Sequence, residues 1–148
     1  MGSEYRQVTI GKFIFRVKED CLYTEAGVWV TPPAAAGTVR VGLSDFRQQS
    51  SGDAAFVELP DAGQVVRGGD DLVNVETVKV DLAVLAPFDA AVTAVNEALS
   101  ETPELINQDP YGAGWLVELK PDAWPAPGLL AADAYLAVMT AQAEKASR

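Results

Sequence analysis

The 148-residue sequence contains no histidine, a single cysteine and two methionines. Without histidine, the Ser-His-Asp and Cys-His nucleophile systems and the usual zinc sites are excluded. The single Cys21 cannot form an intramolecular disulfide framework. Carboxylates remain as candidates for acid–base chemistry, but they are scattered singly over predicted turns. We therefore expect the chain not to be an enzyme, and a small carboxylate-based enzyme is the weaker alternative.

Positive charge is scarce as well. The formal net charge is −10, and the stretch from Asp45 to Asp109 contains thirteen acidic residues but only three basic ones. Such a surface repels phosphate backbones, so we expect no nucleic-acid partner. No apolar run approaches the roughly 20 residues that span a bilayer, and the N-terminus does not read as a secretory signal. These absences predict a cytoplasmic protein without a membrane partner.

The residues that are present predict a mainly β protein. A hydrophobic fraction of 49% with 8% aromatic residues is typical of a folded chain, and its length suits one domain. Short valine-rich runs alternate with Gly, Pro and Asp, as in strands joined by tight turns. The predicted strands are Gln7–Val17, Tyr23–Thr31, Gly37–Leu43, Ala54–Leu59, Gln64–Val66, Asp71–Thr77, Val80–Ala86, Ala90–Val95 and Gly114–Glu118.

Two helices are predicted. Ser44 is a suitable N-cap for a short helix over Asp45–Ser50 that ends near Gly52. A longer helix is predicted over Pro127–Lys145, because apolar residues recur there at a spacing of three and four. These residues are Leu129, Ala132, Leu136, Met139 and Ala143. We expect this stripe to pack against the β core rather than to bind a partner.

Lys79 is the only lysine between Lys18 and Lys120, and it follows a Gly-Gly-Asp-Asp turn. It lies in the sequence Val-Glu-Thr-Val-Lys-Val (75–80), among valines and acidic residues. On this window alone, an ordinary surface lysine is the simpler interpretation. The other interpretation is an amine that is presented at a strand turn for modification by another enzyme.

Several sequence segments, taken in their order along the chain, favour the interpretation that Lys79 is modified by another enzyme. They are GTVRVGLS (37–44), GDAAFVELP (52–60), GQVVRGGD (63–70), VETVK (75–79), LAP (85–87), VNEAL (95–99), PELINQDPYG (103–112) and GWL (114–116). With these segments, the stretch from Tyr23 to Lys120 resembles the lipoyl-carrier H-protein of the glycine cleavage system, within the wider biotinyl/lipoyl domain family. The segment at 103–116 is the most specific to the H-protein branch.

The resemblance implies a flattened barrel-sandwich hybrid with a C-terminal α-helix. It implies a single lipoyl-carrier domain over 1–148, with an N-terminal extension (1–22), a barrel-sandwich core (23–120) and a helix (127–145). Lys79 would carry lipoate in amide linkage at a hairpin, and Glu76 would contact the attaching enzyme. Biotin is disfavoured because Val78 and Val80 stand where biotin domains usually carry methionines.

The resemblance also implies partners. A lipoate ligase or a lipoyl synthase would modify the chain, and dihydrolipoyl dehydrogenase would reoxidise the arm. The loaded arm would visit either the glycine cleavage enzymes or a heterodisulfide-reductase-like complex.

The sequence departs from the H-protein pattern at the expected arm-binding cleft, formed by Ala26, Val28, Trp29 and Ala83. Ala26, Val28 and Ala83 replace polar family residues, and Gly27 replaces a histidine. An aminomethyl ammonium group there would be buried without partners, at a cost of about a few kcal/mol.

The apolar cleft and the extension over 1–22 resemble the H-protein-like lipoate-binding proteins of sulfur-oxidising prokaryotes. We therefore expect lipoyl-Lys79 to carry sulfur intermediates by dithiol–disulfide exchange for a heterodisulfide-reductase-like complex. An aminomethyl carrier of the glycine cleavage system is the first alternative, and an unmodified scaffold is the second. Cys21 is expected to be a buried small hydrophobe, with exchange against the lipoyl dithiol as its alternative.

Overall fold

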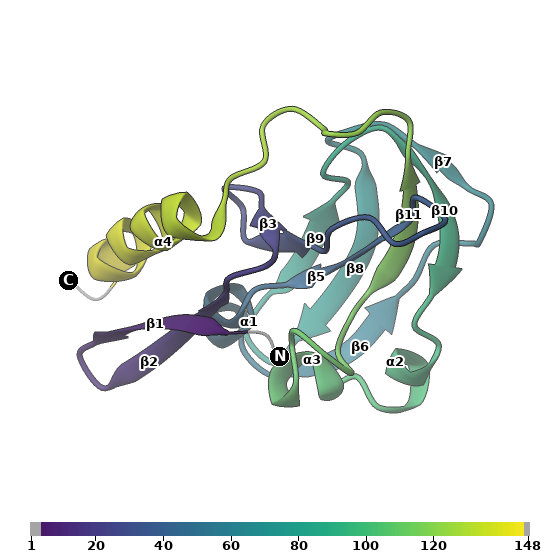
Figure 1. The fold of residues 1–148 in the computed structure, drawn as a ribbon. Coiled ribbons are helices and arrows are strands. Elements are labelled where there is room, and N and C mark those ends of the chain that lie inside the picture. Colours follow the sequence, from purple (N-terminus) through teal and green to yellow (C-terminus); the bar gives the residue numbers. More distant parts are fainter. Residues whose placement is uncertain (1–3, 147–148) are drawn as a thin grey trace.

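The structure, a computed structural model, describes residues 4–146 as three β-sheets with helices at their edges (Figure 1). The strands are β1 (Tyr5–Ile10), β2 (Phe13–Lys18), β3 (Leu22–Tyr23), β4 (Val28–Val30), β5 (Val39–Leu43), β6 (Ala54–Glu58), β7 (Val65–Val66), β8 (Asp71–Thr77), β9 (Asp81–Leu85), β10 (Ala90–Val95) and β11 (Val117–Pro121). The helices are α1 (Asp45–Ser51), α2 (Ala98–Glu101), α3 (Leu105–Gln108) and α4 (Ala132–Ala146). The mainly β class with a C-terminal helix is confirmed.

Two sheets enclose the main core. A six-stranded sheet has the order β3-β4-β5-β11-β10-β7, and a three-stranded sheet has the order β6-β8-β9. Alternation decides which side chains face inward: in β9, Leu82 and Val84 are buried while Asp81 and Ala83 are exposed. These inward residues share one apolar cluster with Val41 of β5 and residues of β11 and β10, so the core lies between the two sheets.

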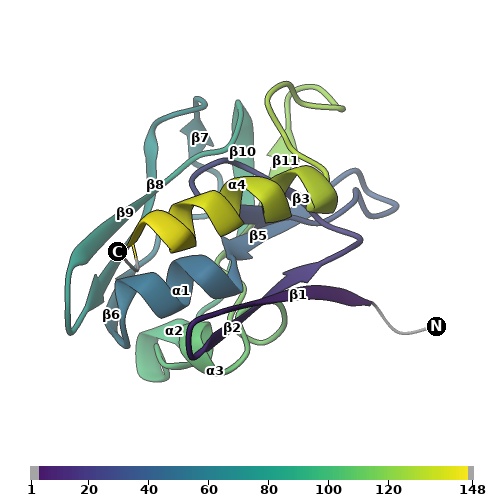
Figure 2. The same ribbon diagram turned by 90° about the vertical axis from the view of Figure 1, so that its left-hand side faces the viewer.

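The N-terminal segment forms a hairpin of β1 and β2 rather than one strand over Gln7–Val17. Gly11 adopts a positive φ of 62° in the turn, a conformation that interrupts a strand and suits glycine. This hairpin packs with α1 and α4 around a second apolar cluster that includes Phe15, Tyr23 and Met139. Figure 2 shows α4 lying across the side of the molecule that also carries α1 and the hairpin.

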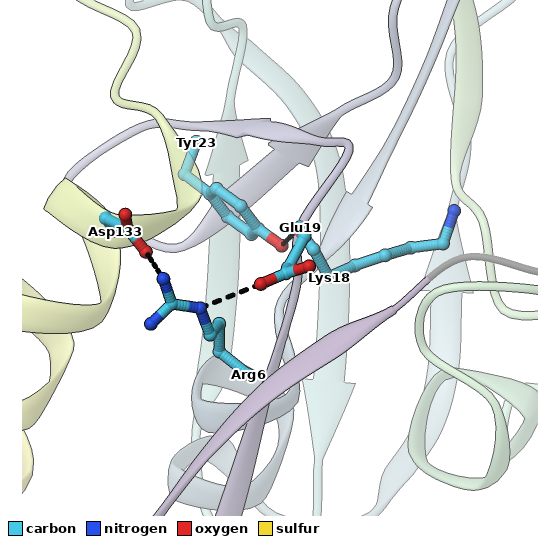
Figure 3. A network of polar contacts seen from close by, with 5 residues as sticks. All are labelled: Arg6, Lys18, Glu19, Tyr23 and Asp133. Carbon is cyan, nitrogen blue, oxygen red and sulfur yellow. Dashed lines mark hydrogen bonds and ion pairs between the residues drawn. The ribbon is translucent and has the colours of Figure 1, made fainter.

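Arg6 links the hairpin to α4. Its Nε donates to Glu19 Oε1 at 2.7 Å, and its Nη2 lies 2.7 Å from Asp133 Oδ1 in the first turn of α4 (Figure 3). Beside it, the Tyr23 hydroxyl donates to the Lys18 carbonyl at 2.7 Å. The Tyr23 ring stacks on that of Tyr135 with centroids 4.5 Å apart, so the hairpin, β3 and α4 form one packed unit.

Several predicted boundaries are wrong, for identifiable reasons. The C-terminal helix begins at Ala132 rather than Pro127, because Leu130 and Tyr23 exchange backbone hydrogen bonds of 2.7 and 2.8 Å in an extended bridge. The strand predicted over Tyr23–Thr31 is divided into β3 and β4 by a turn at Gly27, whose φ is +89°. The short helices α2 and α3 are absent from the prediction because four residues are too few to show a helical period.

Among residues 4–146, the structure contains no helix that is both long and apolar enough to cross a membrane.

Candidate functional site

Lys79 lies at the tip of the hairpin between β8 and β9. The Thr77 amide donates to the Val80 carbonyl at 2.8 Å, which leaves Val78 and Lys79 as the two loop residues. The Thr77 hydroxyl oxygen accepts from the amides of Lys79 (3.1 Å) and Val80 (2.9 Å) and donates to the Ser51 carbonyl at 2.6 Å. One side chain therefore satisfies the amides of Lys79 and Val80 and anchors the hairpin tip to the end of α1, while the Val78 amide donates to the Asp53 carbonyl at 3.0 Å.

The Lys79 side chain is exposed and lies against the C-terminus of α1. Its Nζ donates to the Ser50 carbonyl at 3.1 Å. The helix ends at Gly52, which has a φ of +94°, and a Cβ added there would lie 3.2 Å from the Lys79 Cβ. Glycine at this position therefore both ends the helix and leaves room for the lysine.

Asn107 of α3 fixes the junction that supports the hairpin. Its Nδ2 donates to Gln48 Oε1 at 2.9 Å and to the Gly52 carbonyl at 3.1 Å. Its Oδ1 accepts from the Ala54 amide at 2.8 Å. One amide side chain thus joins α1, the turn after it and the start of β6, which is the neighbour of β8.

The surface around the lysine is both apolar and acidic. Val78 and Val80 are 79% and 43% exposed, and Phe56 on the neighbouring strand is 53% exposed. Glu76, an expected site residue, is exposed three positions before the lysine and is paired across the hairpin with Asp81. An accessible primary amine on a fixed hairpin is well placed to be acylated by another enzyme.

The cavities among residues 4–146 include two that bear on this hairpin and on the expected arm-binding cleft. The smaller one, of about 220 Å³, is lined by Lys79 itself together with residues of β1, β2, α1 and α4; we call it the hairpin cavity. Its lining residues are Ile10, Phe13, Phe15, Phe46, Gln49, Ser50, Lys79, Ala143 and Ala146. The larger one, of about 630 Å³, is lined mainly by β9 and by the turn between β3 and β4; we call it the β9 cavity.

The β9 cavity contains three of the four residues expected in the arm-binding cleft. Ala26, Val28 and Ala83 line it, together with the charged residues Glu25 and Arg47. Trp29, the fourth expected residue, does not line this cavity. Its side chain is turned away: the ring covers Gly42, where a Cβ would lie 2.5 Å from it, and Nε1 donates to the Pro110 carbonyl at 2.9 Å.

Cys21 is 2% exposed and belongs to the apolar cluster beneath the N-terminal hairpin. Burial raises the pKa of its thiol to about 12, despite the opposing effect of Lys18. Its surroundings are those of a buried small hydrophobe and not of a reactive thiolate. Within residues 4–146, no group of three His, Cys, Asp or Glu side chains is placed to hold a metal ion.

Sequence reasoning missed four residues of the site: Thr77, Gly52, Asn107 and Arg47. The first three lie inside the matching segments of the resemblance, and Thr77 is only two positions before the lysine. A hydroxyl at the start of a two-residue loop is a known signal for side-chain capping of a turn. Arg47 carried no comparable signal, because only the tertiary fold brings α1 beside β9.

Comparison with known proteins gives a consistent result. The sequence model of the glycine cleavage H-protein family matches residues 21–142. The glycine cleavage system H protein of Thermus thermophilus is 41% identical over 128 residues, which are 86% of this chain and 98% of that protein. A probable glycine cleavage system H protein of Pyrococcus horikoshii is 47% identical over 107 residues, covering 72% of this chain and 78% of that protein.

A solved structure supports the same relationship. The crystal structure of a glycine cleavage system H protein from Mycobacterium marinum superposes with a TM-score of 0.73 at 36% sequence identity. The match covers 80% of this chain and 95% of that one.

Proposed function

Because the chain belongs to the glycine cleavage H-protein family, whose members carry lipoate covalently on a lysine, we propose that Lys79 is the lipoylated residue. The chain is then a carrier and not a catalyst. The observation that carries this proposal is the presentation of Lys79 at the tip of a two-residue hairpin loop. Bound lipoate supplies a reducible disulfide at the end of a flexible arm.

The residues around Lys79 hold the attachment point of this arm in place. Amide formation removes the lysine charge but keeps one N–H, which can still donate to the Ser50 carbonyl that Nζ contacts. Thr77 and Gly52 hold the attachment point in one place, so the sulfur atoms reach successive enzymes at a high effective concentration. The exposed Glu76 carboxylate is the proposed contact for a lipoate ligase or lipoyl synthase.

Ligation in vitro tests the attachment. Purified chain with lipoate, ATP and a lipoate ligase should gain the mass of one lipoyl group, and Lys79→Arg should gain none. Lys120→Arg is the matched control and should be modified like the wild type. An unmodified wild-type chain under conditions that lipoylate another H protein would favour the unmodified scaffold instead.

The comparisons support aminomethyl transfer in the glycine cleavage system as the first candidate for the cargo. The relatives described above are named as glycine cleavage system H proteins, and two of them are matched over nearly their whole length. The glycine cleavage enzymes and dihydrolipoyl dehydrogenase would then be its partners.

The β9 cavity supports a second candidate, a sulfur cargo delivered to a heterodisulfide-reductase-like complex. Val28 and Ala83 provide no carboxylate for an ammonium group, and Arg47 is among the residues that line the cavity. A half-buried cation opposes an aminomethyl ammonium and suits an anionic thiolate or sulfur oxyanion. Glu25 also lines the cavity, but it is exposed to water, which screens its charge.

Glycine decarboxylase exchange distinguishes the two cargoes. The lipoylated chain is assayed with the decarboxylase, using a lipoylated glycine cleavage H protein as the reference. Exchange at a comparable rate supports the aminomethyl carrier. Background exchange by a fully lipoylated chain, with uptake of sulfur from a small sulfane donor, supports the sulfur carrier.

A further inference from the structure

The hairpin cavity is a feature that the family relationship does not explain. Its outer wall is built by Ile10, Phe13 and Phe15 of the N-terminal hairpin, and the family match begins only at residue 21. Lys79, in the loop between β8 and β9, lines the same cavity, whereas the residues of these two strands do not. The part of the chain outside the family match therefore adds a wall beside the attachment lysine.

We propose that the hairpin cavity holds the resting lipoyl arm of Lys79, so that its methylene chain and dithiolane ring lie against Phe13, Phe15 and Phe46. This inference rests on the proposed lipoylation of Lys79. It assigns the resting position to this cavity rather than to the β9 cavity, whose lining does not include Lys79.

The lining fits the chemistry of this occupant. An amide-linked lipoyl group is uncharged and largely apolar, and the cavity wall consists mainly of aromatic rings and methyl groups. Phe15 and Phe46 meet edge to face with centroids 5.2 Å apart, and Phe13 stacks on Phe15 at 6.0 Å. The polar exceptions, Gln49 and Ser50, lie on α1, where the Ser50 carbonyl accepts from the root of the arm.

The wall is held in place before any arm binds. The Arg16 amide donates to Asp45 Oδ2 at 2.9 Å, and Gln49 Nε2 donates to the Ile14 carbonyl at 3.0 Å, so β2 is fixed to α1. The ion pair between Arg6 and Asp133 fixes β1 to α4 (Figure 3). A preformed apolar site loses little conformational freedom on binding, which favours occupancy.

The proposed resting arm also accounts for the exposure of the Phe13 side chain. This side chain is 48% exposed at the hairpin turn, with Lys12 Nζ 5.6 Å from the ring centroid. An arm that enters the cavity would cover part of this ring and thereby bury apolar surface on both partners. Ile14, the next residue, is 50% exposed but lies on the opposite face of the hairpin and does not line the cavity.

Reduction of the dithiolane by an uncharged water-soluble phosphine tests the proposal on the lipoylated chain. The phosphine becomes a phosphine oxide with oxygen from water, while the disulfide gains two electrons and two protons to become the dithiol. We expect Phe13→Glu to accelerate this reduction about tenfold or more over the wild type, because it opens the cavity to water. The matched control Ile14→Glu introduces the same charge on the same turn and should react like the wild type.

A second measurement locates the arm without any substitution. Protein lipoylated with ¹³C-labelled lipoate should show nuclear Overhauser contacts from the methylenes to the Phe13 and Phe46 ring protons. Contacts to Val28 and Leu82 in their place, or acceleration by Ala83→Glu and not by Phe13→Glu, would put the arm in the β9 cavity and overturn the proposal. Reduction as fast as that of free lipoamide in the wild type would also overturn it. Since intact mass establishes the attachment separately, these failures are distinct from a failure of lipoylation.

Discussion

Single side chains decide the geometry around Lys79, and Thr77 contributes most. Its hydroxyl accepts from the amides of Lys79 and Val80 and donates to the Ser51 carbonyl at the end of α1. The sequence identified the lysine but not this support. A lone lysine in an acidic stretch is conspicuous, whereas threonine is common in strands and reveals its role only through its contacts.

Thr77→Val should destabilise the chain by about 1–2 kcal/mol and slow lipoylation. Valine has nearly the same shape as threonine but no hydroxyl, so the amides of Lys79 and Val80 and the Ser51 carbonyl each lose a hydrogen-bond partner. Urea unfolding and ligase kinetics provide the two measurements. Thr77→Ser keeps the hydroxyl and should stay close to wild type in both. Equal effects of valine and serine would show that the hydroxyl is not the cause.

Cys21 makes stability sensitive to alkaline pH. Its thiol has a pKa of about 12 in the folded chain against an ordinary 9.0, because burial disfavours the thiolate. Above pH 9 the unfolded chain therefore releases this proton first. The stability contributed by the protonated thiol is complete below pH 9 and is lost as pH rises toward 12, by up to about 1.4 kcal/mol per pH unit.

Cys21→Ala should flatten the pH dependence of the unfolding free energy between pH 9 and 10. Burial also raises the pKa of Tyr135 to about 12, but from an ordinary value of 10.0. Its effect on the unfolding free energy therefore begins at a higher pH than that of Cys21. Urea titrations at half-unit pH steps provide the measurement. Parallel curves for the variant and the wild type would refute the assignment.

At the scale of elements, the sequence predicted β8 and β10 with their observed bounds and α1 with its Ser44 cap. These elements have clear alternation or a clear capping residue. It did not predict α3, since four residues show no period, although α3 supplies the amide that holds the lysine-bearing region together. The start of α4 was also missed, because the bridge between Leu130 and Tyr23 joins residues far apart in sequence.

Asn107→Ala should destabilise the chain by about 2–3 kcal/mol, because it removes three hydrogen bonds from the junction of α1, α3 and β6. Asn107→Asp keeps the acceptor for the Ala54 amide but turns an oxygen toward the oxygens of Gln48 and Gly52. We therefore expect it to be at least as destabilising as alanine at pH 7. Thermal unfolding measures both, and a loss below about 0.5 kcal/mol would contradict the role given to Asn107.

At the scale of the whole molecule, the family resemblance predicted the fold and singled out Lys79, but it did not predict that Lys79 and the expected arm-binding residues line different cavities. The β9 cavity contains Ala26, Val28 and Ala83, whereas the lysine opens onto the hairpin cavity. Trp29 illustrates why sequence was insufficient: it adjoins Val28, yet alternation in a strand turns the two side chains to opposite faces.

The double variant Val28→Glu with Ala83→Asp should raise glycine decarboxylase exchange by about tenfold. Its two carboxylates would then pair with the aminomethyl ammonium group in the β9 cavity. The double variant Val28→Gln with Ala83→Asn has the same shape without the charge and should not gain. Both variants must first be shown to be folded and fully lipoylated, since Val28 is only 4% exposed. No gain by the charged variant would show that these positions do not limit aminomethyl transfer.

Lipoylation of Lys79 is the central claim, and peptide mapping of the chain isolated from its own cells tests it most directly. Cleavage before aspartate places Lys79 alone on the peptide 71–80, apart from the other four lysines, at positions 12, 18, 120 and 145. We predict the lipoyl mass on Lys79 and on none of the other four. A lipoyl group on another lysine, or an unmodified Lys79 in cells whose other lipoyl proteins are fully modified, would contradict the account.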